Sequence, residues 1–197
     1  MIHPTAYLPP VVYMVELLHD MNPVIEIHET YVKQTCRNHC AIGGPNGRQI
    51  LTLPVTRPNG NRTLTKDIRI DNRQPWQRIH WRSIVTAYSN APFFLYYQDY
   101  LEPFYSRSWE FLIEFNTALL SRLLEVIRIP RPITYTGHFH RESLRTGQHD
   151  PVSKKNLFSN TSYLQPFSPA NGFLANLSVI DTLFNLGPET GEYLEKQ

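Results

Sequence analysis

Hydrophobic positions in the first 55 residues form one helical pattern and several strand patterns. Apolar side chains recur at helical spacing in residues 9–19, where two prolines suit the first helical turn. Residues 22–29 are rich in β-branched side chains and predict a short strand. Residues 31–55 predict two strands joined by a hairpin, because Asn46-Gly47 tolerates positive φ at both central turn positions. This part of the chain therefore predicts one helix and a hairpin beside a strand.

The middle of the chain is dominated by helical periodicity. Residues 74–88, 90–105 and 109–129 each repeat apolar side chains at three- and four-residue intervals, which predicts three helices. Pro130 ends the last of them, and residues 133–137 predict a strand. The order of elements so far is typical of a mixed α/β protein.

The C-terminal part predicts a further helix over residues 179–186. Ser178 has the spacing of an N-cap, with an acidic residue in the first turn, and Gly187-Pro188 is a helix stop. A turn and a final short helix are expected to follow. Residues 137–169 are polar and weakly periodic, so we expect a long loop or lid there.

The predicted fold class is α/β, with residues 1–197 as a single domain. We expect a mixed β-sheet that contains a β-hairpin and is flanked by helices, for which a Rossmann-like arrangement is one form. Hydrophobic residues make up 41% of the chain and charged residues 18%, which is typical of a folded globular protein rather than a disordered one.

Charge and cysteine content exclude several classes of protein. The formal net charge is only +2, whereas non-specific nucleic-acid binders carry a clear basic excess, so no nucleic-acid partner is expected. Two cysteines make no disulfide framework, and no signal-peptide pattern opens the chain. No apolar run approaches the roughly 20 residues that span a bilayer. We therefore expect a cytoplasmic protein without a membrane span.

A polar cluster precedes the predicted hairpin turn. If residues 31–38 form a strand, Lys33 and Arg37 share one face while Gln34 and Asn38 share the other. Two cations and two amides this close together could bind an anionic group such as a diphosphate. They could equally coat a solvated strand face.

Metal binding has little support in the sequence. A first candidate set combines thiols with imidazoles, and a second contains only imidazoles, but neither has the paired Cys-x-x-Cys spacing of zinc sites. The sets are His28, Cys36, His39 and Cys40, and then His138, His140 and His149. We expect no metal and no cofactor.

The predicted helix over residues 74–88 carries a second candidate site. His80 and Ser83 are three residues apart and so lie on adjacent positions of the helix, which raises the possibility of a nucleophilic serine. No third orienting group is identifiable, and His80 could instead be a hydrogen-bonded core residue. Contact of His80 and Arg82 with a ligand is a stronger interpretation than a nucleophilic serine, and the core role of His80 stays open.

A polar stripe marks the predicted C-terminal helix. Ser178, Asp181 and Asn185 recur along an otherwise apolar helix. Asp181 must cap the helix, pair with a cation or act as a general base. One hypothesis is that it pairs with Arg37 or Lys33 across the domain.

Four blocks of the sequence resemble the WbqC-like protein family, and they follow the order of that family. They are "AYLPPVVYMVELL", "HETYVKQTCRNHCAIGGPNGRQILTLPV", "IHWRSIVTAYSNAPFFLYY" and "NGFLANLSVIDTLFNLGPE". Together they extend from Ala6 to Glu189. The family is named from bacterial genes in O-antigen and other surface-polysaccharide clusters.

The resemblance implies a role in surface-polysaccharide biosynthesis, as a transferase on a nucleotide-activated sugar. The alternative is a non-enzymatic binding or scaffold protein that recognises a glycan intermediate or a partner enzyme of the pathway. The expected ligand is an anionic small molecule such as a nucleotide sugar. Asp181 and His80 are the predicted catalytic residues. The predicted substrate contacts are Lys33, Gln34, Arg37, Asn38, Arg82 and Asn185.

Overall fold

A three-stranded parallel sheet forms one part of the computed structural model, which describes residues 1–140 and 158–197. The sheet contains β1 (Ile2–Pro4), β2 (Val24–Glu26) and β7 (Thr134–Tyr135) in the order β1-β2-β7. Helix α1 (Val11–Leu18) connects β1 to β2, as a parallel pair requires a crossover. Both the helix and the strand predicted in this part of the chain are confirmed.

The predicted hairpin is also present, but it is shorter than expected. Strands β3 (His39–Gly44) and β4 (Gly47–Thr52) pair in antiparallel register, and Gly47 begins β4 with a φ of 95°. The prediction of a strand over residues 31–38 is wrong. These residues turn instead, with Gln34 in the left-handed region and with the amides of Asn38 and His39 donating to the Thr35 carbonyl.

A second antiparallel pair follows the hairpin. Strands β5 (Val55–Thr56) and β6 (Arg69–Ile70) are joined by two short 3-10 turns, η1 (Gly60–Arg62) and η2 (Thr65–Asp67). Pro54, which has no amide hydrogen to donate to a ladder, separates β4 from β5. The parallel and antiparallel pairings are thus distributed over three small sheets.

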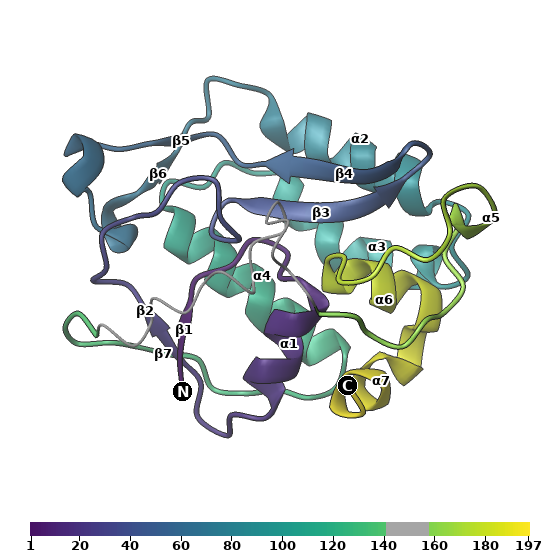
Figure 1. Ribbon diagram of the computed structural model, residues 1–197. Helices are drawn as coiled ribbons and strands as arrows, with labels where there is room; N and C mark the ends of the chain where they lie inside the picture. Colours follow the sequence, from purple (N-terminus) through teal and green to yellow (C-terminus); the bar gives the residue numbers. More distant parts are fainter. Residues whose placement is uncertain (141–157) are drawn as a thin grey trace.

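The three predicted central helices form the main helical layer. They are α2 (Trp76–Tyr88), α3 (Phe94–Leu101), which continues into the 3-10 segment η3 (Glu102–Tyr105), and α4 (Leu112–Val126). In Figure 1, α4 runs through the middle of the molecule, with the β3–β4 hairpin and α2 on one side and α1 on the other. The core lies around α4, whose buried side chains include Leu112, Phe115 and Leu119.

The C-terminal segment closes the core. After α5 (Ser168–Asn171) come α6 (Val179–Leu186), η6 (Gly187–Glu189) and α7 (Thr190–Glu195), and α6 packs against α1, α3 and α7. The Ser178 hydroxyl accepts a hydrogen bond from the Ile180 amide, so the predicted N-cap is confirmed. The amide of Ser178 itself donates to the Ala41 carbonyl, which joins α6 to the hairpin.

The predicted α/β class, with a hairpin and flanking helices in one compact domain, is confirmed. Most of the loop predicted over residues 137–169 lies outside the described residues, because these omit 141–157. Within the described part of the chain, no helix is both long enough and apolar enough to cross a membrane.

Candidate functional site

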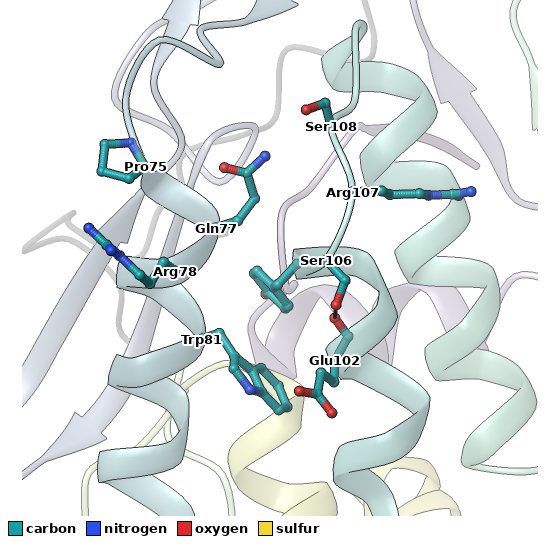
Figure 2. Close-up of a pocket in the computed structure, with 9 residues that line it drawn as sticks. Pro75, Gln77, Arg78, Trp81, Glu102, Ser106, Arg107 and Ser108 are labelled. Carbon is teal, nitrogen blue, oxygen red and sulfur yellow. Dashed lines mark hydrogen bonds between the residues drawn. The ribbon is translucent and has the colours of Figure 1, made fainter.

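An open depression of about 540 Å³ lies between the first turns of α2 and the η3 segment with the residues that follow it. Figure 2 shows Trp81 and Glu102 extending toward each other across this space, while Arg78 and Arg107 lie at opposite rims and point outward. The lining combines one indole, one carboxylate, two guanidinium groups and several neutral polar groups. Its residues are Pro75, Gln77, Arg78, Trp81, Glu102, Tyr105, Ser106, Arg107 and Ser108.

Stacked aromatic rings form the inner wall of the depression. The Trp81 ring lies 5.6 Å from the Tyr105 ring at an interplanar angle of 27°, and 6.5 Å from the Phe94 ring at 30°. Tyr105 is also in edge contact with Phe115 in the centre of α4. Because these rings pack against the core, the wall is held in place without any ligand.

The rim of the depression carries its charges. Arg107 places its guanidinium carbon 3.9 Å from the centre of the Trp109 ring, a cation–π contact that holds it at one side. Arg78 is exposed on α2 at the other side. The Ser106 hydroxyl donates to the Glu102 backbone carbonyl, which closes the η3 turn and fixes the position of that residue.

The wall of the depression continues into the protein as a row of polar groups. The Tyr105 hydroxyl lies 3.0 Å from the Tyr7 hydroxyl, which lies 2.8 Å from Nδ1 of His80. Burial lowers the pKa of His80 to about 4, and a backbone hydrogen bond with Thr52 opposes this effect. Burial also raises the pKa of Tyr7 and of Tyr105. At neutral pH the three side chains are therefore uncharged.

His80, a predicted catalytic residue, is thus buried inside the protein, and Tyr7 connects it to Tyr105, one of the residues that line the depression. Ser83, three residues further along α2, accepts a hydrogen bond from the Gln49 side chain. Arg82 is exposed on the same helix. The structure keeps His80 apart from Arg82, since one faces the core and the other faces solvent.

Arg37 forms an ion pair in the interior. Arg37 and Glu29 are both 0% exposed, and Nη2 of Arg37 lies 2.6 Å from Oε1 of Glu29. Nε of Arg37 donates to the same oxygen, and Nη1 donates to the Thr35 hydroxyl. Burial raises the pKa of Glu29, and the nearby Arg37 guanidinium opposes that shift. The predicted pairing of Arg37 with Asp181 is wrong, because Glu29 takes that place.

The other members of the predicted polar cluster point in different directions. Lys33 and Gln34 are exposed on the turn, whereas Asn38 is buried and its amide donates to the Leu53 carbonyl at 3.0 Å. The α4 residue Asn116 donates to the Arg37 carbonyl and so holds the turn from inside. The four predicted residues therefore share no accessible surface, and contact with a substrate stays a prediction for each of them.

Asp181 lies in a second interior network, which contains only neutral donors among the described residues. Its Oδ2 accepts from the Tyr88 hydroxyl at 2.9 Å, and its Oδ1 accepts from Tyr163 at 2.6 Å and from Gln165 at 2.9 Å. Asn185 donates to the Asp181 backbone carbonyl. Burial raises the pKa of Asp181, and the hydrogen bonds from Tyr163, Gln165 and Tyr88 oppose the shift. The network joins the segment after residue 158 to α6 and α2.

No group of three His, Cys, Asp or Glu side chains is arranged to hold a metal ion within residues 1–140 and 158–197. Cys36 and Cys40 are buried free thiols, and burial raises the pKa of Cys40. The rings of His138 and His140 lie 4.3 Å apart, while His149 lies outside the described residues. The chemistry that this part of the chain offers is thus that of hydrogen bonds, ring contacts and guanidinium groups.

Sequence reasoning missed Glu102, Tyr105 and Arg107 in the depression and Glu29 in the interior. One signal for the first group was available. Pro103 interrupts the helical pattern of residues 90–105, which predicts that the helix ends there. Residues around such a break, which include Glu102 and Tyr105, then no longer follow the helical pattern. No local signal identifies Glu29, because its partner lies eight residues further along, beyond a turn.

Comparisons with known proteins give the family of the chain. One similar protein is the uncharacterized protein Rv1507c of Mycobacterium tuberculosis (strain ATCC 25618 / H37Rv), which is 24% identical over 195 residues, with 83% of each chain covered. No solved structure matches the chain. The model of the WbqC-like protein family matches residues 5–166. With most of its length matched in this way, the chain belongs to the WbqC-like protein family.

Proposed function

We propose that this protein takes part in surface-polysaccharide biosynthesis as a transferase, and that it binds a nucleotide-activated sugar in the depression between α2 and η3. The observation that carries the proposal is the lining of that depression, which places an indole and a carboxylate inside and one arginine at each rim. Its volume of about 540 Å³ falls within the range of roughly 300–1,000 Å³ that is usual for small-molecule sites.

Trp81 and Glu102 are the kinds of residue that would bind the sugar half of the ligand. A sugar ring has C–H groups on its face and hydroxyl groups at its edge. It can therefore pack against an indole while its hydroxyls donate to a carboxylate. Trp81 stacks on Tyr105 behind it, so its ring is already oriented for such packing.

The arginines at the rim support binding of the diphosphate, the anionic half of a nucleotide sugar. A guanidinium group binds phosphate oxygens through two parallel N–H donors, which makes arginine the preferred residue for a diphosphate. Arg78 and Arg82 are four residues apart on α2 and so occupy neighbouring positions of one face. In this proposal the sugar enters the depression and the diphosphate stays at the rim, where Arg78 and Arg107 lie. Arg82, one turn further along α2, is a third proposed contact.

His80 is the proposed catalytic group with a path to the depression. It is neutral at pH 7 and can take up a proton through Tyr7 and Tyr105, which lie in hydrogen-bond contact with one another. The acid–base role predicted for Asp181 has no such path among the described residues, since both of its oxygens accept hydrogen bonds from buried or half-buried donors. We propose that Asp181 stabilises the fold.

The second candidate function is recognition without catalysis, of a glycan intermediate or of a partner enzyme. The burial of both His80 and Asp181 favours it, since neither reaches a ligand directly. Exposed side chains on α3 favour it too, because Leu95 is 70% exposed and Tyr96 is 73% exposed. Aromatic residues such as tyrosine are enriched at binding surfaces.

Thermal unfolding in the presence of nucleotide sugars tests the proposal. We expect UDP-glucose or GDP-mannose to raise the Tm of the wild type above the value with free UDP or GDP, since ligand at 100 times its Kd adds about 2.7 kcal/mol to stability. Release of nucleoside diphosphate then separates a transferase from a binding protein. A wild type that no nucleotide sugar stabilises would contradict the proposal.

Matched variants locate the site. Trp81→Ala and Arg78→Ala are expected to abolish the rise in Tm, because they remove the ring contact and a phosphate contact. Arg122→Ala, which alters an exposed arginine on α4 away from the depression, is the control and should keep the full rise. Equal effects of Arg78→Ala and Arg122→Ala would show that binding depends on general charge and not on the depression.

A further inference from the structure

Arg107, one of the residues that line the depression, rests against an aromatic ring at the rim. Its guanidinium carbon lies 3.9 Å from the centre of the Trp109 ring, and its side chain is exposed to solvent. A guanidinium group has five N–H donors, and contact with the face of one ring leaves most of them for a ligand. The ring therefore holds the charge in place without using up its hydrogen-bonding capacity.

The ring beneath Arg107 is itself fixed by the core. Trp109 stacks on Phe104 at 5.8 Å with an interplanar angle of 4°, and it is in edge contact with the buried Phe115 at 5.4 Å. Nε1 of Trp109 donates to the Phe104 carbonyl at 3.0 Å, and the Asn72 side chain donates to the Trp109 carbonyl at 2.8 Å. These contacts hold both the indole and its backbone, so Arg107 rests on a rigid surface.

A second arginine of the chain provides a comparison. The guanidinium carbon of Arg69 lies 5.0 Å from the centre of the Phe111 ring, but Arg69 also forms an ion pair with Glu110. Arg107 forms neither an ion pair nor a side-chain hydrogen bond within the part of the chain that the structure describes. Its charge is thus positioned but not neutralised, which leaves it available to an anion.

The two ends of the depression differ in charge. Figure 2 shows Ser108 and Arg107 at one end, and Trp81 and Glu102 at the other. The Glu102 carboxylate repels a diphosphate, whereas Arg107 attracts one and the hydroxyl of Ser108 can donate to it. An anionic group is therefore favoured at the end that contains Arg107.

We propose that Arg107 is the residue that fixes the diphosphate of the ligand, that Trp109 is its positioning residue, and that the nucleotide leaves the depression over residues 106–108. Arg78, at the opposite rim, contacts no aromatic ring of the described residues and contributes positive charge without a fixed direction. This inference rests on the proposed function for the identity of the ligand. It deepens that function by naming the arginine that sets the orientation of the nucleotide sugar.

Substitution by lysine separates a fixed guanidinium group from a general positive charge. Lysine keeps the charge but lacks the planar fork that stacks on a ring and binds two phosphate oxygens. We expect Arg107→Lys to weaken the binding of UDP-glucose about tenfold and Arg78→Lys to weaken it less than about threefold, as measured by calorimetry. Arg69→Lys, outside the depression, is the matched control and should bind as the wild type does. Equal losses in Arg107→Lys and Arg78→Lys would overturn the inference.

Trp109→Leu tests the positioning role. Leucine keeps an apolar contact with the core but removes the ring on which Arg107 rests. In folded Trp109→Leu protein, a further Arg107→Lys substitution should weaken binding by less than about threefold, because the arginine has lost its fixed orientation. A merely structural role of Trp109 would leave the tenfold difference between arginine and lysine intact, and that result would contradict the proposal.

The anion site is measurable without a sugar. Hydrogens against the face of an indole resonate upfield in NMR spectra, so the Arg107 Hε signal, assigned by its loss in Arg107→Lys, should move downfield in Trp109→Leu. Titration of the wild type with inorganic pyrophosphate should shift the Arg107 signal and leave that of Arg69 in place. A titration that shifts both signals equally, or neither of them, would refute the anion site.

The two proposals fail separately. If UDP-glucose does not bind the folded wild type while pyrophosphate shifts the Arg107 signal, the proposed function fails for this donor and the anion site stands. If UDP-glucose binds but the lysine variants of Arg107 and Arg78 lose affinity equally, the proposed function stands and the role of Arg107 is refuted.

Discussion

Two regions of this protein hold arginine beside aromatic and polar groups, and they differ in access to solvent. In the interior, Arg37 is 0% exposed and makes its ion pair with Glu29. In the depression, Arg78 and Arg107 stand at the rim with free approach from solvent, and Trp81 and Glu102 lie between them. The charge of Arg37 is already neutralised by Glu29 of the same chain, whereas the arginines at the rim are free to bind an anionic ligand from solvent.

This difference in access to solvent means that the interior arginine contributes to stability, whereas the exposed arginines are available for binding. A buried charge that loses its partner is left without solvation, so the interior pair is needed for the fold even though replacing both of its members can be neutral. An exposed arginine costs little to remove but is available to a phosphate. Of the polar cluster that the sequence singles out, Arg37 and Asn38 therefore belong to the interior, and only Lys33 and Gln34 are accessible.

The largest expected effect comes from breaking the interior pair. Arg37→Met leaves the Glu29 carboxylate buried without its cation and should lower the free energy of unfolding by about 3–5 kcal/mol. Urea denaturation measures this loss. Arg122→Ala is the matched control, since the exposed pair of Arg122 with Glu125 is worth about 0.3–0.5 kcal/mol. A loss for Arg37→Met no greater than that of the control would contradict the structural role of the pair.

A second large effect concerns pH. His80 titrates near pH 6.5 in the unfolded chain and near 4 when folded, so between these values only the unfolded state binds the proton. The free energy of unfolding should fall as the pH drops from about 6.5 to about 4, by up to about 3 kcal/mol. Denaturation at several pH values measures it, with His80→Gln as the variant that lacks this component. A wild type and variant with equal pH dependence would refute the buried neutral histidine.

Asp181 should give a smaller effect of opposite sign. Burial raises its pKa, so its contribution to stability is present below the unfolded value and is lost as the pH rises through the folded value. Asp181→Asn keeps the shape of the side chain and removes the titration. We expect a loss of about 1 kcal/mol and less decline of stability with rising pH. Unchanged pH dependence in the variant would show that the carboxyl does not titrate differently in the folded state.

The smallest effect on stability is expected in the depression. Glu102→Gln alters an exposed side chain without a buried partner, so the free energy of unfolding should change by less than about 0.5 kcal/mol. Its affinity for UDP-glucose should nevertheless fall about tenfold, because an amide accepts more weakly than a carboxylate. A large loss of stability would place Glu102 with the interior residues instead.

The elements of the fold were largely predictable because their signals are local. Helical periodicity and proline stops predicted α2, α4 and α6, and Asn46-Gly47 predicted a hairpin turn at this place. The central turn residues are, however, Pro45 and Asn46, and of the predicted pair only Gly47 has a positive φ. The strand expected over residues 31–38 failed for a physical reason. The buried contacts of Arg37 and Asn38 hold these residues in a turn, and such tertiary contacts override a local strand preference.

The candidate site was less predictable, because its residues come from separate segments. Trp81 and His80 lie in a motif that the sequence singles out, but Tyr105 joins them only through the packing of η3 on α2. The hydrogen-bond contact between His80 and Tyr7 joins residues 73 positions apart, and no sequence pattern predicts it. The distinctive residues around Arg37 suggested an anion site, since a sequence does not show that Glu29 already neutralises the cation.

The central claim is that ligand binds in the depression and not at the Arg37 turn. The chain has three tryptophans, which give three indole signals in a ¹H–¹⁵N NMR spectrum. Trp76 is buried and donates to Asn72, whereas Trp81 lines the depression. On titration with UDP-glucose, the Trp81 signal should move most and the Trp76 signal least. Saturable binding that leaves the Trp81 signal in place would contradict the account.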